Sequence, residues 1–369
     1  MCSFEQVFGV LFEIVLFLEI GRACVAHKIR KAGLKKGDVS KMEMDIFVPV
    51  LLSFAFAMFL TPLTIKILEK KGVLAIDYYK KERIEVPKSG GVALISASFL
   101  SFFILLLFSY IHPQSNYHQF HNFDFVAILL MLFYGIFGAI DDFTDIGRPI
   151  KIFFPLILSL PALITAHSTE IFLPFIGFFD FSYLFYVIII VYIMVVSNLV
   201  NMHSGFNGLA SGLSAILIAT LLVKIAMKGE DFIFLGCVLG ATLGFLWYNW
   251  YPARVFLGNV GSLSVGAVIG YAIVAFGFFI SGFVMLIPHT ANFILYVYWR
   301  LMHKMRPEDE RFKIVKFGRV REDGTIEVPN RFTLKWILPY YFKMTEKEAV
   351  LAMYALTASF CLISLCIPF

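Results

Sequence analysis

The chain has 369 residues, of which 59% are hydrophobic and 15% are charged, and its mean hydropathy is +0.82. This composition excludes a soluble globular domain and indicates a polytopic membrane protein. The formal net charge of +5 gathers in a few segments, so it reports membrane topology and gives no evidence for nucleic-acid binding.

Residues 1–45 precede the first clean apolar run and carry conflicting signals. Three glutamates in an apolar stretch lead into the basic segment HKIRKAGLKKGDVSK. Ten membrane spans counted from residue 46 would place this segment outside the cell, where basic residues are unusual. Either it is an interfacial helix that folds back, or the natural start is Met42 or Met44. We favour the later start and treat 1–45 as an N-terminal extension.

Apolar runs of about 20 residues, the length that crosses a bilayer as a helix, follow one another from residue 46 onward. We expect an all-α polytopic membrane protein with about ten transmembrane helices in a domain that covers 46–369. The predicted spans lie near residues 46–66, 92–111, 124–140, 152–166, 182–197, 209–227, 231–248, 262–280, 282–300 and 348–367. The stretch 301–347 between the last two spans is predicted to be a cytoplasmic arm.

Lysine and arginine gather on one side of this topology. Nearly all of them lie in loops 67–91, 141–151, 198–208, 249–261 and 301–347. The loop at 112–123 on the other side has none. Because basic loops stay in the cytoplasm, the first face is predicted to be cytoplasmic.

Four polar clusters that interrupt the apolar runs all fall on this cytoplasmic face. They are PKSGG (87–91), DDFTDIG (141–147), NLVNMHSGFNGL (198–209) and FLGNVGS (256–262). A charge within the bilayer costs about 2.5–3.5 kcal/mol, so the adjacent Asp141 and Asp142 at the end of an apolar run need a function. Asp145 would share a helix face with Asp141. Carboxylates of this kind hold hydrated Mg²⁺ that also binds substrate phosphates.

Each cluster also has a purely structural interpretation. An aspartate pair after a helix is commonly a solvated helix end, and PKSGG is compatible with a turn. Adjacent glycines also let a backbone approach a phosphate and point N–H groups at it. Asn201, His203, Asn207 and Asn259 are compatible with helix caps. The convergence of all the clusters on one face favours a shared phosphate and metal site.

The order of the clusters resembles the polyprenyl-phosphate N-acetylhexosamine-1-phosphate transferases. The shared pattern is P-x-x-G-G, D-D-x-x-D, N-x-x-N-x-x-x-G-x-N-G-L and W-Y-P-x-R-V-F-x-G-(D/N). NLVNMHSGFNGLASG and YNWYPARVFLGN are most similar to the eukaryotic and archaeal branch, the UDP-GlcNAc:dolichyl-phosphate GlcNAc-1-phosphotransferases. The resemblance runs from about Met44 to the C-terminus. It includes the arm, in which VREDGTIEV independently predicts a β-hairpin with a D-G turn.

The resemblance implies a role for individual residues. The implied catalytic residues are Asp141, Asp142 and Lys151. The implied substrate-binding residues are Asp77, Lys80, Pro87, Ser89, Gly91, Asn207 and Arg311, with Arg306 as the alternative to Arg311 for the pyrophosphate. The implied metal ligands are Asn201 and Asn259. Lys88 replaces a glutamate of the eukaryotic relatives, which leaves its role open.

Asn259 departs from the family pattern, which places an aspartate there as the principal metal ligand. An amide oxygen still coordinates a hard cation, and the pyrophosphate adds negative charge, so we expect weaker Mg²⁺ binding with retained activity. Mn²⁺ is the alternative ion. A catalytically inactive homologue is a second interpretation that rests on this one residue. A lipid-linked sugar transporter is a third, although the sequence lacks the midplane polar groups and internal repeats typical of transporters.

The implied reaction is attack by a polyprenyl (dolichyl) phosphate oxygen on the β-phosphorus of UDP-GlcNAc, releasing UMP in the first membrane step of lipid-linked glycan synthesis. A phosphate with a second pKa of about 6 is already mostly dianionic at neutral pH, which favours direct displacement over a covalent aspartyl intermediate. The exact N-acetylhexosamine stays open. The implied partners are the UDP-sugar, the lipid phosphate and membrane lipids, with a homodimer left open.

The expected location is the plasma membrane of an archaeon, with a cytoplasmic active site. An endoplasmic-reticulum membrane is the alternative.

Overall fold

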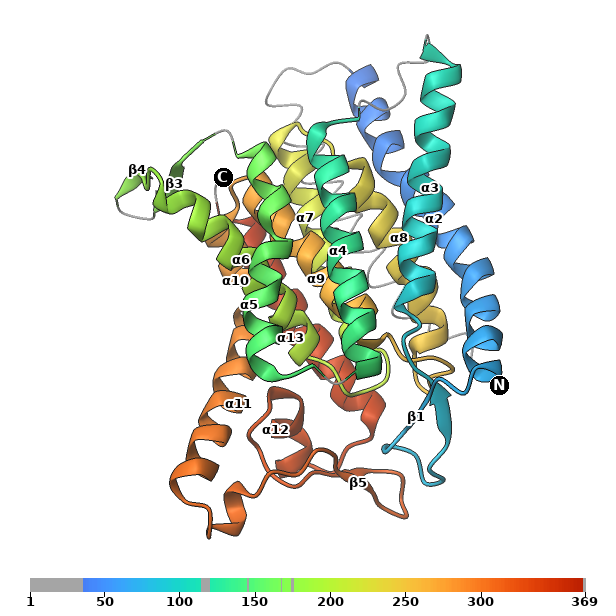
Figure 1. Cartoon of the computed structure of the whole chain (residues 1–369), viewed down its shortest axis with the longest axis vertical. Coiled ribbons are helices and arrows are strands. Elements are labelled where there is room, and N and C mark those ends of the chain that lie inside the picture. Colours follow the sequence, from blue (N-terminus) through green and yellow to red (C-terminus); the bar gives the residue numbers. More distant parts are fainter. Residues whose placement is uncertain (1–35, 114–119, 145, 167, 174–175, 368–369) are drawn as a thin grey trace.

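The computed structural model describes residues 36–113, 120–144, 146–166, 168–173 and 176–367 (Figure 1). The predictions for residues 1–35 and for Asp145 lie outside these ranges. Most of the described chain is helical. The α-helices are α2 (Lys36–Lys70), α3 (Gly91–Ile111), α4 (Asn122–Thr144), α5 (Arg148–Leu158), α6 (Leu184–Met202), α7 (Leu209–Lys228), α8 (Ile233–Asn249), α9 (Gly258–Ala275), α10 (Phe279–Met285), α11 (Ile287–Met305), α12 (Leu334–Tyr341) and α13 (Glu346–Leu365).

Among the described residues, seven helices are long and apolar enough to cross a membrane, and α10 with α11 forms an eighth candidate that is bent by 63°. The predicted count of ten is not confirmed, although each predicted segment is helical. The segment predicted at 152–166 is divided at Ser159 into α5 and the 3₁₀ helix η2 (Leu160–Thr165), with prolines at 155 and 161. The segment predicted at 231–248 is α8, which has only 17 residues. The chain is an integral membrane protein.

The centre of the bundle is α7, whose apolar window is 100% buried. It packs against α8, α9 and α13, while α8 and α9 pack against the outer helices α2, α4 and α6. Lys224, a fully buried lysine of α7, donates to the carbonyl oxygens of Ser364 at 3.2 Å and Ile367 at 3.0 Å. A charge buried among helices therefore satisfies the carbonyl end of α13.

Two-stranded antiparallel hairpins complete the described fold. They are β1–β2 (Leu74–Ile76 and Glu85–Pro87), β3–β4 (Glu170–Leu173 and Gly177–Asp180) and β5–β6 (Arg319–Val320 and Ile326–Glu327). The third hairpin confirms the prediction for the arm: Asp323 Oδ1 accepts from the Thr325 N–H at 2.9 Å, and Gly324 has the positive φ of 84° that a D-G turn requires. The first and third hairpins lie at one end of the bundle, and β3–β4 lies near the other (Figure 1).

Candidate active site

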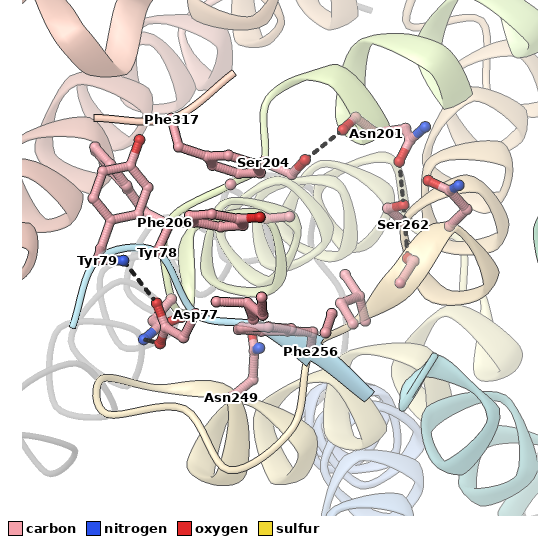
Figure 2. Close-up of a pocket in the computed structure, with 18 of the residues that line it drawn as sticks. Asp77, Tyr78, Tyr79, Asn201, Ser204, Phe206, Asn249, Phe256, Ser262 and Phe317 are labelled. Carbon is pink, nitrogen blue, oxygen red and sulfur yellow. Dashed lines mark hydrogen bonds between the residues drawn. The ribbon is translucent and has the colours of Figure 1, made fainter. Parts of the chain in front are cut away.

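A cavity of about 280 Å³ opens at the end of the bundle that carries the arm (Figure 2). Polar and aromatic side chains line it together: Asp77, Tyr78, Tyr79, Asp142, Asn201, Ser204, Phe206, Asn207, Asn249, Phe256, Asn259, Ser262 and Phe317. Three of the four polar clusters in the sequence contribute to this wall directly. PKSGG lies behind the wall, against α9.

Asp142 belongs to the last turn of α4, and its carboxylate lies against the N-terminus of α9. Its Oδ1 accepts from the Asn259 N–H at 3.0 Å, and its Oδ2 accepts from Ser89 Oγ at 2.7 Å. Gly258 has a φ of 70°, and a Cβ there would stand 2.6 Å from Asp142 Oδ2. The unpaired N–H groups and the dipole at a helix start favour a negative charge. The helix therefore fixes this carboxylate at the wall of the cavity.

Asp141 is held by a cation and an amide. Lys151 Nζ lies 2.7 Å from its Oδ1, and Asn259 Nδ2 donates to its Oδ2 at 2.8 Å. A carboxylate only accepts hydrogen bonds, so the nitrogen end of the Asn259 amide faces Asp141 and its oxygen end is left for the cavity. The structure thus brings together Asp141 and Asp142 of α4, Lys151 of α5 and Asn259 of α9.

The turn at residues 87–91 packs against the loop that leads into α9. The Phe256 N–H donates to Pro87 O at 2.8 Å, the Gly90 N–H to Phe256 O at 2.8 Å, and the Gly91 N–H to Leu257 O at 2.9 Å. The prediction that these glycine N–H groups face a phosphate is therefore wrong. A Cβ on Gly91 would lie 2.3 Å from Gly261 Cα, so this glycine permits the close approach of α3 and α9.

The cavity wall offers oxygen ligands of the kind that a hard cation takes. Asn201 lies across the cavity from Asp77 (Figure 2), and its Oδ1 accepts from Ser262 Oγ at 2.6 Å. Asp142, Asn201 and Asn259 all line the cavity. The described residues contain no group of three or more His, Cys, Asp or Glu side chains that could hold a metal ion, so an ion here would depend on the amides as well. This donor set fits Mg²⁺ or Mn²⁺, with one carboxylate and two amides.

Asp77, Lys80 and Asn207 form a second polar centre beside the cavity. Asp77 Oδ2 accepts from Asn207 Nδ2 at 2.9 Å, and Lys80 Nζ lies 3.1 Å from Asp77 Oδ2 and 3.2 Å from Glu346 Oε2. The ammonium group also lies 3.6 Å from the centroid of the Tyr251 ring. Lys80 is therefore saturated by protein groups and does not line the cavity, whereas Asp77 and Asn207 do.

The arm, residues 301–347, covers the loop between α2 and α3 through aromatic contacts. Phe317 stacks on Tyr78 with ring centroids 4.0 Å apart and planes 8° from parallel. The Tyr79 hydroxyl oxygen accepts from the Gly318 N–H and from Trp336 Nε1, each at 3.2 Å. Burial raises the pKa of Tyr79, so the phenol stays neutral and acts as a fixed joint between loop and arm.

Two further predicted residues lie away from the cavity wall. Arg311 is exposed and forms a paired contact with Asp309, at 3.0 Å from Nε to Oδ1 and 2.7 Å from Nη2 to Oδ2. Arg306, at the end of α11, does not line the cavity either. His203 is buried edge-on to His289 with ring centroids 4.6 Å apart, and burial lowers its pKa well below the usual range. Neither ring nitrogen of His203 has a hydrogen-bond partner among the described residues, so its side chain does not cap a helix as the sequence suggested.

Sequence patterns missed Glu346 and the aromatic wall. Glu346 is an acid in the first turn of α13, just before the predicted span 348–367, and only its burial, at 2% exposure, distinguishes it from an ordinary helix-start acid. Phe206 and Phe256 stand inside motifs that the sequence did single out, but no spacing rule marks them as wall residues.

These features define a class: a polytopic helical membrane protein whose polar cavity offers oxygen ligands beside a helix N-terminus, a site suited to phosphate and a hard cation. Residues 125–277 match the family described as Glycosyl transferase family 4. The chain belongs to this family, which confirms the resemblance seen in the sequence.

Relatives align over most of the chain. The chain is 29% identical to a protein of Sulfolobus acidocaldarius named as a UDP-N-acetylglucosamine–dolichyl-phosphate N-acetylglucosaminephosphotransferase, over 87% of this chain and 95% of the relative. A protein of Saccharolobus solfataricus with the same name is 29% identical over 87% and 96%. The phospho-N-acetylmuramoyl-pentapeptide-transferase of Prochlorococcus marinus is 30% identical over 61% and 67%.

Proposed function

We propose that this protein transfers GlcNAc-1-phosphate from UDP-GlcNAc to dolichyl phosphate and releases UMP. The observation that carries the proposal is that Asp142 and Asn259 meet at the N-terminus of α9, on the wall of a cavity that Asn201 also lines, with Asp141 behind them and bonded to the Asn259 amide. The names of the archaeal relatives, which align along nearly the whole chain, support the donor and the acceptor.

In this reaction a phosphate oxygen of the lipid attacks the β-phosphorus of UDP-GlcNAc. A new phosphorus–oxygen bond forms there, and the bond from the β-phosphorus to the bridging oxygen breaks, so that UMP leaves with the electron pair. Phosphoryl transfer depends mainly on positioning and on neutralisation of charge. The lipid phosphate is already dianionic at neutral pH, so the site needs no strong base.

The position of each residue indicates its role in the reaction. Asp142, fixed by Ser89 and the start of α9, lines the cavity and orients the reacting phosphates together with the cation. Lys151, partly exposed beside Asp141, is placed to take charge from a phosphate oxygen that approaches the pair. Asp141 keeps Lys151 and the Asn259 amide in place.

Asn201, Asn259 and Asp142 are the residues that would hold Mg²⁺, or Mn²⁺ in its place. When bound, the ion polarises phosphate oxygens and neutralises part of the charge of the pyrophosphate. With one carboxylate in this set, binding is expected to be weaker than in a site with an aspartate at position 259.

The direct test is a transfer assay with purified protein, UDP-GlcNAc, dolichyl phosphate and Mg²⁺, in which UMP and the lipid product are both measured. Equal amounts of UMP and lipid-linked GlcNAc-phosphate are expected. A panel of UDP-sugars run in parallel identifies the preferred N-acetylhexosamine. Folded protein that releases no UMP with any sugar would support the inactive homologue, and movement of a lipid-linked sugar across vesicles without UMP release would support a transporter.

We also propose that the cavity faces the cytoplasm of an archaeal cell. The basic loops lie at the same end of the bundle as the cavity, and relatives from two archaeal species align over 87% of the chain. In a cysteine-free background, Lys71→Cys and Glu322→Cys should react with a membrane-impermeant maleimide only in inside-out vesicles. Tyr183→Cys, near the β3–β4 hairpin, should react only in right-side-out vesicles. The reverse pattern would place the active site outside the cell.

A further inference from the structure

Glu346 lies where three segments of the chain meet. It begins α13 and is only 2% exposed. Its Oε1 accepts from the Asn207 backbone N–H at 2.7 Å, and its Oε2 lies 3.2 Å from Lys80 Nζ. Each carboxylate oxygen therefore binds a different segment, the loop before α7 in one case and the first cytoplasmic loop in the other.

These contacts close into a ring. Glu346 Oε2 pairs with Lys80 Nζ at 3.2 Å, and Lys80 Nζ pairs with Asp77 Oδ2 at 3.1 Å. Asp77 Oδ2 accepts from Asn207 Nδ2 at 2.9 Å, and the Asn207 backbone N–H donates to Glu346 Oε1 at 2.7 Å, which closes the ring. Asn207 is thus held at both its main chain and its side chain. Because Asp77 only accepts, the nitrogen end of the Asn207 amide faces Asp77 and the oxygen end is left for the cavity that Asn207 lines.

Neither Glu346 nor Lys80 lines the cavity. This geometry therefore does not support a direct contact of Glu346 or Lys80 with the substrate. α13 makes one more contact with the same loop, since Tyr354 Oη donates to Gly208 O at 2.6 Å. The last helix consequently fixes two consecutive residues of the loop that enters the cavity.

We propose that Glu346 is a positioning residue for the sugar nucleotide and acts through Asn207 and Lys80. This inference rests on the proposed transferase function. Charge-assisted hydrogen bonds between buried groups are stronger than neutral ones and fix one geometry. The loss of the Glu346 charge leaves Lys80 with one carboxylate partner and loosens the loop that carries Asn207.

The alternative is that Glu346 merely stabilises the start of α13. That start has its own capping box: Thr345 Oγ1 accepts from the Glu348 N–H at 3.4 Å, and Glu348 Oε2 accepts from the Thr345 N–H at 2.7 Å. Glu348 lies in the same helical turn, is also a glutamate, and forms hydrogen bonds with Thr345. It is therefore a matched control for Glu346.

The test compares Glu346→Gln with Glu348→Gln in the transfer assay and in calorimetric titration with UDP-GlcNAc. Glu346→Gln should raise KM and Kd for UDP-GlcNAc about tenfold, the size expected for a lost charge-assisted contact. Its kcat should change less than about threefold, and KM for dolichyl phosphate should stay unchanged. Glu348→Gln should lower thermal stability and leave both constants for UDP-GlcNAc as they are. Glu346→Asp, which keeps the charge but shortens the side chain, should recover part of the affinity.

The inference is overturned if Glu346→Gln matches Glu348→Gln in KM and Kd, or if only kcat falls. If Glu346→Gln does not fold, Glu346→Asp decides by the same measurements, with an expected two- to threefold rise in Kd and an unchanged kcat. The proposed function fails separately, since wild-type protein would then neither bind UDP-GlcNAc nor release UMP.

Discussion

Asp142 and Asp77 both line the cavity, but their carboxylates have different partners. Asp142 accepts from a serine hydroxyl and from backbone N–H groups at the start of α9, which are neutral donors. Asp77 pairs with Lys80, which is shared with Glu346. The carboxylate of Asp142 is therefore left for a bound cation, whereas the carboxylates of Asp77 and Glu346 share the buried ammonium group of Lys80. Similar acids thus form the proposed reaction centre in one place and a support in the other.

The largest expected effect is the loss of transfer when Asp141 or Asp142, the aspartates of the first centre, is neutralised. Asp142→Asn or Asp141→Asn should each lower kcat on the order of 10³-fold, because the first weakens the cation site and the second releases Lys151, and both groups stabilise charge at the reacting phosphates. The Asp142 variant should lose only about 1 kcal/mol of unfolding free energy, since an amide oxygen still accepts at the helix start. The assay measures UMP release beside thermal unfolding, with the exposed Asp180→Asn as control. Near-normal turnover in both variants would remove the pair from the active site.

A substitution in the second centre, formed by Asp77, Lys80 and Asn207, should show its effect first in the stability of the fold. Lys80→Gln leaves Asp77 and Glu346 without their shared cation, and removal of one partner from a buried ion pair costs about 3 kcal/mol. We expect a clear fall in the denaturant midpoint, together with weaker UDP-GlcNAc binding. Lys71→Gln, at an exposed position in the same loop, should behave as wild type. Equal midpoints for the two variants would mean that the ring of contacts does not support the fold.

Asn259→Asp tests whether the first centre binds a cation. The new carboxylate would stand where Asn259 Nδ2 now lies 2.8 Å from Asp141 Oδ2, so two like charges would face each other until a cation separates them. A charge pair about 4 Å apart is worth roughly 4 kcal/mol at an effective dielectric of about 20, before desolvation. Part of this should appear as a several-fold lower Mg²⁺ concentration for half-maximal transfer.

The same variant gives a readout without turnover. Its melting temperature should fall in EDTA and recover with Mg²⁺ more than that of the wild type, because the cation relieves the repulsion. An unchanged metal requirement together with no Mg²⁺-dependent recovery would exclude Asn259 as a ligand. The ion would then depend on Asn201 and the aspartates.

The smallest effect concerns Lys335, which joins the arm to the cavity loop through Ser204 O. Burial lowers the pKa of Lys335 from 10.5 to about 8. Between these values the unfolded chain binds more protons than the folded one, so folding stability should rise as pH increases from about 8 to 10.5 and be flat below. Lys335→Met should remove this slope in urea unfolding at several pH values. A slope that persists in the variant would belong to another group.

The sequence by itself determined the class of the protein, the helical segments and the residues of the first centre. Hydropathy and turn chemistry are local properties, so every predicted span is helical and the D-G hairpin in the arm is present. Motif spacing sufficed for Asp141, Asp142 and Asn259 because they lie in the last turn of α4 and the first turn of α9, which meet at the same end of the bundle.

Only the tertiary structure decided how those residues are used. Whether α8 and the α5–η2 segment are long enough to cross a membrane depends on where their helices end. The glycine N–H groups of the 87–91 turn are consumed by the loop before α9, a pairing that spans much of the chain. Lys80 and Glu346 meet across 266 positions of sequence. No periodicity or spacing encodes such a contact, because it arises from the packing of the helices that carry the two ends.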